Sequence, residues 1–173
     1  EDWENFLKKK KKNINKNFLK KINNNCIFFS RLHKQKGLDI LIEAWTEINN
    51  QNWSLDIVGF GNQKHFKNII ADKKNNKIRF LKPILSLSKR NRLFNNYDFL
   101  ALPTTSENFG MVILESLTRG LPVLTTNETP WIDIQNKNAG WVINYSAIEL
   151  KLVLNQIFDT KNKEFFVKKK NAI

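Results

Sequence analysis

Short, continuously apolar segments alternate in this chain with segments whose apolar residues recur at helical spacing. The apolar segments predict strands at residues 26–30, 53–59, 78–81, 97–103, 122–125 and 141–143. Between them, apolar periodicity and capping residues predict helices at 37–45, 63–72, 86–95, directly after Gly110, and at 147–158. Strands without polar alternation are typical of sheets covered on both faces. The sequence therefore predicts an α/β fold, a doubly wound parallel sheet of the Rossmann-like kind.

The chain of 173 residues is long enough for one ordinary domain and short for two. We expect the folded domain to occupy residues 26–158. Residues 1–25 are polar and rich in lysine, and we expect them to form a basic N-terminal segment or linker. Residues 159–173 are expected to form a basic C-terminal tail. Because the first residue is Glu1 and not methionine, the chain can be a piece of a longer protein.

A formal net charge of +13 raises the question of nucleic-acid binding. Lysine supplies 24 of the 29 basic residues, whereas arginine, the usual source of bidentate contacts to bases, supplies only 5. Many lysines gather near the chain ends, for example at 8–12 and 168–170. This distribution favours a solvated surface, or one facing an anionic membrane, over a nucleic-acid site. Residues 1–25 are a candidate for contact with anionic lipid, and nucleic-acid binding is the disfavoured alternative.

Cys26 is the only cysteine, so neither a disulfide framework nor a cysteine-based metal site is expected. His33 and His65 are the only histidines, and the sequence shows no cluster of metal ligands. No run of about 18 apolar residues predicts a transmembrane helix, and no signal peptide is recognisable. We therefore expect a cytoplasmic protein without a metal or other cofactor, either free or peripheral at the inner face of the membrane.

Charged residues and glycines follow the predicted strands, at the end where ligands of parallel sheets bind. Arg31 and Lys36 follow the first strand and suit a diphosphate, with a lysine-rich surface loop as the alternative. Val-Gly-Phe-Gly at 58–61 follows the second strand, but Lys64 stands where a dinucleotide-binding fingerprint needs its third glycine. These glycines are expected to form a tight turn that leaves room for a ligand.

The segment Ser-Glu-Asn-Phe-Gly-Met-Val-Ile-Leu-Glu-Ser-Leu at 106–117 follows the fourth strand and opens a helix. Glu107 lies just before the helix, where a row of free backbone N–H groups attracts anions. Glu115 lies inside it on an apolar stretch, where a carboxylate is costly unless a partner satisfies it. The alternatives are a favourable helix-dipole position for Glu107 and an i,i+4 ion pair of Glu115 with Arg119. Carboxylates beside an anion site suit a ligand that is half sugar and half phosphate.

Three motifs, in this order and spacing, resemble the C-terminal, donor-binding half of a GT-B glycosyltransferase of family 4, the glycosyl transferases group 1 class. They are Phe-Phe-Ser-Arg-Leu-His-Lys-Gln-Lys-Gly at 28–37, Val-Gly-Phe-Gly at 58–61 and Ser-Glu-Asn-Phe-Gly-Met-Val-Ile-Leu-Glu at 106–115. The resemblance covers residues 26–158. Gly-Leu-Pro-Val at 120–123 and Glu-Thr-Pro-Trp at 128–131 are similar to members that act on bacterial surface polysaccharides.

The resemblance implies retaining transfer of a hexosyl group from a nucleoside diphosphate sugar to an acceptor hydroxyl, without a metal. Arg31 and Lys36 would hold the donor diphosphate, and Glu107 would hydrogen-bond the donor sugar; these three are the implied catalytic residues. Glu115 would bind the ribose hydroxyls. The other residues implied in donor binding, with the base beside 81–82 and backbone N–H groups presented by 109–111, are Gly59, Gly61, Leu81, Lys82, Asn108, Phe109, Gly110 and Met111.

Two departures from the family pattern are visible, because Ser30 and Lys82 stand where glycine is frequent. Residues 1–25 are too short to supply the N-terminal, acceptor-binding domain of such an enzyme. We therefore expect the isolated chain to bind a nucleotide sugar but to transfer little. Its partners would be the missing domain and an acceptor glycan or lipid-linked glycan, in the synthesis of cell-surface polysaccharide or lipopolysaccharide. A non-catalytic module that binds nucleotide sugar is the alternative.

Overall fold

The computed structural model describes residues 22–48, 52–71, 77–160 and 162–172. Six parallel strands form one sheet in the order β3-β2-β1-β4-β5-β6. The α/β, doubly wound parallel sheet predicted from the sequence is thus confirmed. The expectations for residues 1–25 fall largely outside the described residues. The strands are β1 (Asn25–Phe29), β2 (Ser54–Val58), β3 (Ile78–Leu81), β4 (Phe99–Leu102), β5 (Val123–Thr126) and β6 (Gly140–Ile143).

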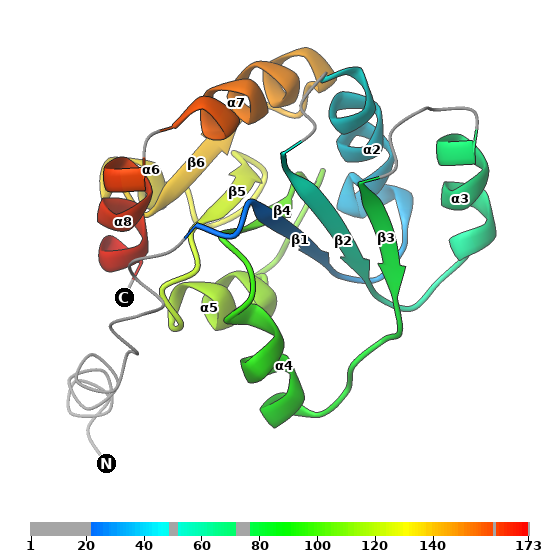
Figure 1. The fold of residues 1–173 in the computed structure, drawn as a ribbon, viewed down its shortest axis with the longest axis horizontal. Coiled ribbons are helices and arrows are strands. Elements are labelled where there is room, and N and C mark those ends of the chain that lie inside the picture. The colour runs from blue at the N-terminus through cyan, green and yellow to red at the C-terminus, as the bar shows by residue number, and fades with distance from the viewer. Residues whose placement is uncertain (1–21, 49–51, 72–76, 161, 173) are drawn as a thin grey trace.

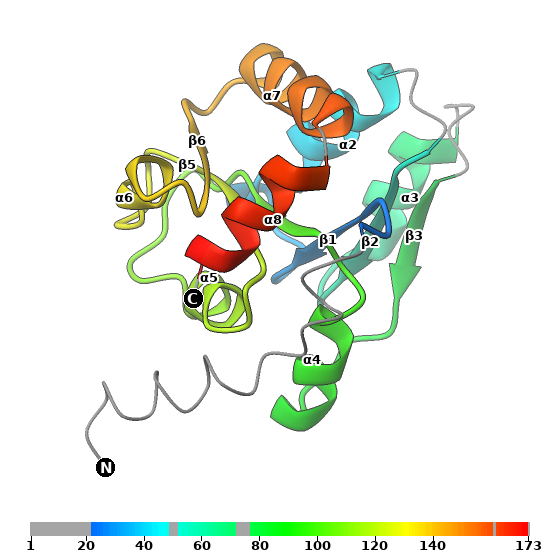
Figure 2. The same cartoon turned by 60° about the vertical axis from the view of Figure 1, so that its left-hand side comes forward.

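Helices cover both faces of the sheet (Figures 1 and 2). One face carries α2 (Leu38–Glu47), α3 (Gln63–Ala71) and α7 (Ala147–Asp159), and the other carries α4 (Leu87–Phe94) and α5 (Met111–Leu117). The remaining helices are the 3-10 helix η1 (Lys34–Lys36), the short α6 (Asp133–Asn136) and the last helix, α8 (Asn162–Asn171). Cover on both faces explains the continuous apolar strands, since β4 and β5 are buried at every position.

An aromatic cluster joins α7 and α8 to the sheet. The Trp53 ring stacks on those of Phe158 and Phe165, with centroid distances of 5.1 and 5.8 Å. The Phe165 ring also meets the Trp141 ring edge-on, with centroids 5.6 Å apart, and its centroid lies 6.4 Å from that of Phe99. Both Phe99 and Phe165 are completely buried. Because large rings contribute much buried apolar area, this cluster ties the two C-terminal helices to the main core.

Helix α8 lies within the stretch 159–173, which the sequence suggested would be a basic tail outside the domain. Instead, Lys169 of α8 is fully buried, and its Nζ donates to Asp98 Oδ1 at 2.8 Å. Asp98 Oδ2 accepts in turn from the backbone N–H groups of Asn23 and Asn25. A buried charge is tolerated when it is paired and hydrogen-bonded in this way. The folded domain therefore extends past residue 158.

The strand order reverses beside β1, which pairs with β2 on one side and with β4 on the other. In a doubly wound sheet, the loops that leave the carboxyl ends of two such strands diverge and open a crevice. The loop after β1 carries Arg31 and Lys36, and the loop after β4 carries Glu107. The topology therefore brings these three residues to the same edge of the sheet.

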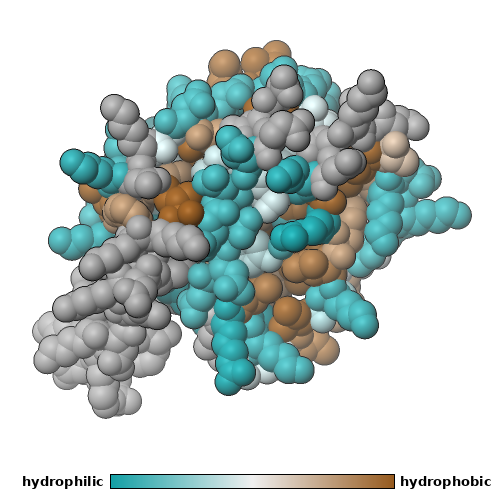
Figure 3. All heavy atoms as spheres, in the orientation of Figure 1, coloured by the Kyte–Doolittle hydropathy of each residue, from teal (hydrophilic) through white to brown (hydrophobic). Residues whose placement is uncertain are grey.

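The outer surface is rich in polar side chains. Hydrophilic residues are spread across the face shown in Figure 3, with hydrophobic patches between them. Within the described ranges, none of the helices combines the length and apolar character needed to cross a membrane.

Candidate functional site

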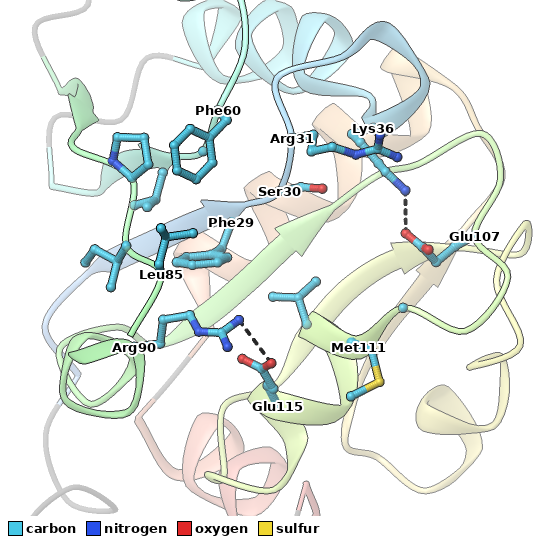
Figure 4. A pocket seen from close by; sticks show the side chains of 16 residues that line it. Phe29, Ser30, Arg31, Lys36, Phe60, Leu85, Arg90, Glu107, Met111 and Glu115 are labelled. Atoms are coloured by element: carbon cyan, nitrogen blue, oxygen red, sulfur yellow. Dashed lines mark hydrogen bonds and ion pairs between the residues drawn. The ribbon is translucent and has the colours of Figure 1, made fainter. Parts of the chain in front are cut away.

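A cavity of about 450 Å³ opens at the carboxyl ends of β1 and β2, facing the start of α5 (Figure 4). Four regions that are distant in sequence form its wall. They are the end of β1 with the loop after it, the end of β2, the segment after β3 with one side chain of α4, and the region around the start of α5. The lining residues are Phe29, Ser30, Arg31, Lys36, Val58, Gly59, Phe60, Pro83, Ile84, Leu85, Arg90, Glu107, Gly110, Met111, Val112 and Glu115.

Two backbone segments are pressed together at the floor of the cavity. The Ser30 N–H donates to the Val58 carbonyl at 3.1 Å, and Leu32 forms a parallel bridge with Gly61. A Cβ atom on Gly59 would lie only 1.7 Å from the Ser30 carbonyl oxygen. Gly59 is therefore required by the close approach of the two loops, a packing reason that applies with or without a ligand.

The loop after β1 holds Lys36 at the cavity wall. His33 caps the 3-10 helix η1, since its Nδ1 accepts from the Gln35 N–H at 3.3 Å. Gly37 ends η1 with a φ of 68°, and a Cβ atom there would lie 1.8 Å from the Pro103 carbonyl oxygen. Lys36 is only 8% exposed. His33 thus acts as a structural cap, while Lys36 is directed inward.

Lys36 and Glu107 form an ion pair, with Lys36 Nζ 2.6 Å from Glu107 Oε2. The loops that carry them are also tied together by backbone. The Gln35 carbonyl accepts from the Thr104 hydroxyl at 2.8 Å and from the Thr105 N–H at 2.9 Å. The structure therefore brings two of the predicted site residues into direct contact and fixes both of their loops. Arg31 lines the same cavity and is exposed.

Helix α5 begins beside the cavity. Gly110 is its N-cap residue with a left-handed φ of 74°, and no side chain caps the helix start. The first N–H groups of a helix have no acceptor within the helix. Gly110 and Met111 line the cavity, and Met111 is 59% exposed. The beginning of α5 can therefore offer backbone donors to an anionic or hydroxyl-bearing ligand.

Glu115 pairs at the cavity wall with a residue that the sequence did not single out. Its Oε1 lies 3.1 Å from Arg90 Nη1 of α4, and the two side chains are 15% and 25% exposed. Arg119, the partner considered from sequence, donates from Nη1 to the backbone carbonyl oxygen of Glu115. Burial lowers the pKa of the Arg119 guanidinium, and the charge of Glu115 opposes that shift. The ionic partner of the Glu115 carboxylate is therefore Arg90.

Several residues implied by the resemblance are not part of the cavity wall. Leu81 ends β3 and Lys82 follows it, but the wall beyond β3 is formed by 83–85. Gly61 is likewise outside the wall, in the bridge with Leu32. Asn108 and Phe109 lie between Glu107 and the start of α5 without lining it. Their roles in donor binding stay predictions.

Phe109 instead contacts the segment after β5. Its ring meets that of Trp131 edge-on, with centroids 5.5 Å apart, and its carbonyl oxygen accepts from Trp131 Nε1. This contact joins the predicted Glu-Asn-Phe-Gly motif to the Glu-Thr-Pro-Trp motif at 128–131. The two motifs therefore form one structural unit beside the cavity.

The cavity also contains residues that sequence reasoning missed. Phe29 ends the apolar strand β1, and Phe60 stands between two glycines. Leu85 and Arg90 follow β3 in a segment without a recognisable motif. The one sequence signal that could have identified Phe60 is its position directly after the end of a predicted strand. Nothing local distinguishes Arg90 from the neighbouring basic residues of α4.

Three cations and two carboxylates line the cavity, so its wall carries one net positive charge. The Lys36–Glu107 and Arg90–Glu115 pairs lie at opposite sides of it, with apolar side chains between (Figure 4). Such a site can bind an anion with its cations and hydroxyl groups with its carboxylates. In the part of the chain that the structure describes, no three His, Cys, Asp or Glu residues are grouped to hold a metal ion.

Solved structures of glycosyltransferases share this fold. The C-terminal domain of the group 1 protein LpcC of Francisella tularensis aligns with a TM-score of 0.73 at 19% identity, covering 86% of this chain and 81% of that domain. WaaG, a glycosyltransferase involved in lipopolysaccharide biosynthesis, aligns with a TM-score of 0.77 at 26% identity. That alignment covers 99% of this chain and 46% of WaaG. HepE of Anabaena, solved in complex with UDP-glucose, aligns with a TM-score of 0.70 at 26% identity, covering 87% of this chain and 43% of HepE.

The chain spans between 27% and 43% of the length of the first curated relatives that it matches. Its fold is that of the C-terminal domain of GT-B enzymes, as the alignment with LpcC shows. The family described as "Glycosyl transferases group 1" matches residues 9–170. This match covers nearly the whole chain, including all but the last residue of α8. The chain therefore belongs to the glycosyl transferases group 1 family, family 4 of the glycosyltransferases.

Proposed function

We propose that this chain is the donor-binding half of a retaining glycosyltransferase that transfers a hexosyl group from a nucleoside diphosphate sugar to an acceptor hydroxyl. The observation that carries the proposal is the cavity itself. It combines Arg31 and the Lys36–Glu107 pair with Glu115 at the crevice of a doubly wound sheet. Such a crevice is where nucleotides bind in folds of this class. The complex of HepE with UDP-glucose supports a nucleotide sugar as the ligand class.

The proposed roles follow from charge and position. Arg31 and Lys36 bind the diphosphate, and Glu107 accepts hydrogen bonds from hydroxyls of the donor sugar. Glu115 binds the ribose, and the start of α5 offers backbone N–H groups. During transfer the bond from the anomeric carbon to the diphosphate breaks, and its electron pair stays with the nucleoside diphosphate. The acceptor oxygen bonds to that carbon on the same face, and its proton passes to the departing phosphate oxygen.

The cations matter most as the diphosphate departs, because negative charge then builds up on its oxygens. Lys36 is mostly buried, and its loop is tied to the loop that carries Glu107, so its charge already lies beside the cavity before the reaction. Lys36 must be drawn from Glu107 toward the phosphates, or shared between the two. Glu107 therefore tunes how strongly Lys36 binds the diphosphate.

The acceptor is proposed to be a glycan or lipid-linked glycan of a cell-surface polysaccharide, a class supported by the alignment with WaaG. An acceptor-binding half would have to close over the cavity, whose rim carries the exposed apolar side chains Phe60, Leu85 and Met111. Because the chain spans less than half of WaaG and HepE, we expect donor binding without efficient transfer by the chain alone. The same observation favours a non-catalytic nucleotide-sugar-binding module as the second candidate. Adding an acceptor-binding half distinguishes them, since only the catalytic half would regain transfer.

The first experiment is thermal unfolding with UDP, GDP, ADP and their sugars, beside a DNA oligonucleotide, in the wild type and in Glu115→Ala. A ligand at about a hundred times its dissociation constant stabilises the fold by roughly 2.7 kcal/mol. The proposal expects one nucleotide to stabilise the wild type selectively and the variant much less. Stabilisation by DNA alone, equal in both proteins, would contradict nucleotide-sugar binding by this chain.

A further inference from the structure

The Arg90–Glu115 pair occupies the side of the cavity away from Lys36 and Glu107 (Figure 4). The Arg90 guanidinium carbon lies 6.0 Å from the centroid of the Phe29 ring. The guanidinium is thus held between an aromatic face and a carboxylate, each of which attracts a cation. Both side chains belong to the cavity wall and are partly exposed. Arg90 is therefore a fixed part of this site and not a mobile surface cation.

The pair leaves two polar atoms unused. Arg90 Nε and Glu115 Oε2 are shielded from solvent and have no hydrogen-bond partner among the described residues. Such atoms cost free energy unless a partner satisfies them. One of the two is a donor and the other an acceptor, so a complementary ligand must present both functions within a short distance. A hydroxyl group donates and accepts, and two neighbouring hydroxyls satisfy both atoms at once.

Charge argues for hydroxyls and against phosphate at this side of the cavity. The Arg90 guanidinium already has a carboxylate as its neighbour, and a phosphate placed there would be repelled by Glu115. The other side of the cavity carries two cations, Arg31 and Lys36, and one carboxylate, Glu107, so the net positive charge of the wall lies there. A nucleoside diphosphate therefore fits the cavity with its phosphates near Arg31 and its sugar hydroxyls near Arg90.

We propose that Arg90 is a binding residue of the ribose subsite, acting with Glu115 as one unit that recognises the two neighbouring ribose hydroxyls. Arg90 holds Glu115 through Nη1 and donates from Nε to one hydroxyl, while Glu115 accepts from the other through Oε2. This recognition requires a small turn of the two partly exposed side chains, which brings both shielded atoms to the ligand. This inference rests on the proposed function, because it requires a ribonucleotide in the cavity.

The test is calorimetric titration of the 173-residue chain with UDP, GDP and ADP and with their 2′,3′-dideoxy forms. Arg90→Met removes the donors but keeps an unbranched apolar side chain. Arg92→Met, an exposed arginine of the same helix that does not line the cavity, is the matched control for the lost charge. Arg90→Lys keeps the charge but loses the planar fork that reaches Glu115 and the ligand together.

Arg90→Met should weaken binding of the ribonucleotide by about tenfold or more, and of the dideoxy form by less than about threefold, as expected for a charged hydrogen bond to a hydroxyl. Arg92→Met should weaken both forms equally and slightly. Arg90→Lys should fail to restore the preference for the ribonucleotide. Circular dichroism before titration establishes that each variant is folded. If Arg90→Met is unfolded, Arg90→Lys takes its place in the comparison of the two nucleotide forms.

Equal losses with both nucleotide forms would overturn the inference and would place the Arg90 contact on phosphate or base. Losses matched by Arg92→Met, or full restoration by Arg90→Lys, would also overturn it. These outcomes differ from failure of the proposed function. In that case the wild type would bind none of the three ribonucleotides, and the inference would fall with it.

Discussion

Lys36 and Glu107 lie 71 residues apart in the chain, yet Lys36 Nζ donates to Glu107 Oε2 at 2.6 Å. Both side chains are mostly buried, with exposed fractions of 10% and 19%. A charged pair at this depth is less screened than one on the surface. The site therefore holds the cation proposed to bind phosphate against the carboxylate proposed to bind sugar. On this proposal, donor binding has to divide the pair between two ligand groups.

We expect Glu107→Gln to strengthen binding of UDP, or of whichever nucleoside diphosphate stabilises the wild type, by about two- to fivefold. Lys36 then no longer has a competing carboxylate, and a partly exposed ion pair is worth about 1 kcal/mol. The added affinity of the nucleotide sugar over the nucleotide should fall, because the charged acceptor for sugar hydroxyls is lost. Calorimetric titration with the nucleotide and with its sugar measures the two affinities. Glu128→Gln is the control, because it removes an exposed carboxylate outside the cavity wall. The prediction would be contradicted if Glu107→Gln bound UDP more weakly than the wild type while Glu128→Gln bound it equally well.

Lys169→Met should lower the free energy of unfolding by about 3–5 kcal/mol, the usual cost of leaving a buried charge unpaired. Asp98 is completely buried and would lose its only ionic partner among the described residues. Urea denaturation followed by circular dichroism gives the value. Lys170→Met, which removes an exposed lysine from the same helix, should change it little. Equal stability of both variants would mean that α8 is not a structural part of the domain.

Gly59→Ala should destabilise the fold by about 1–3 kcal/mol, because the added methyl group must displace backbone. Its Cβ would lie 1.7 Å from the Ser30 carbonyl oxygen, where no side chain can move away. The same shift should disturb the cavity wall and weaken nucleotide binding. Thermal unfolding with and without nucleotide measures both effects. Lys64→Ala, at an exposed position shortly after it, should leave both unchanged.

Stability should decline at alkaline pH through two buried acids. Burial raises the pKa of the Cys26 thiol well above its ordinary value of 9.0. Burial, followed by the hydrogen bond that its hydroxyl donates to Asp56, raises the pKa of Tyr97 above its ordinary 10.0. The folded protein keeps both protons at a pH where the unfolded chain releases them. The free energy of unfolding should therefore fall above pH about 9, by at most about 1.4 kcal/mol per pH unit for each group.

Urea denaturation at a series of pH values above about 8 tests this slope. Cys26→Ala and Tyr97→Phe each remove one titrating group, so each should flatten the decline, and the double variant should flatten it further. An unchanged slope in the double variant would assign the alkaline loss of stability to other groups.

Most of the fold could be predicted from local sequence. Strand β3 occupies residues 78–81 as predicted, and α4 lies within the predicted 86–95, because strand and helix periodicities and capping residues are short-range signals. Helix α8 was not predicted, because its place in the domain depends on contacts between residues that are distant in sequence. Its lysines resemble those of a solvated tail, and only packing reveals that Phe165 enters an aromatic cluster and that Lys169 meets Asp98.

The sequence by itself determined the class of the fold, the family, and the loops that carry Arg31, Lys36, Glu107 and Glu115, because these depend on patterns within a few residues of each other. The tertiary structure alone decided the partners, Lys36 with Glu107 and Glu115 with Arg90. An ion pair depends on the positions of two atoms in space, and the strand order 3-2-1-4-5-6 sets those positions by bringing distant loops to one crevice. Arg90 has no distinguishing neighbours in the sequence, so only the folded chain identifies it as part of the site.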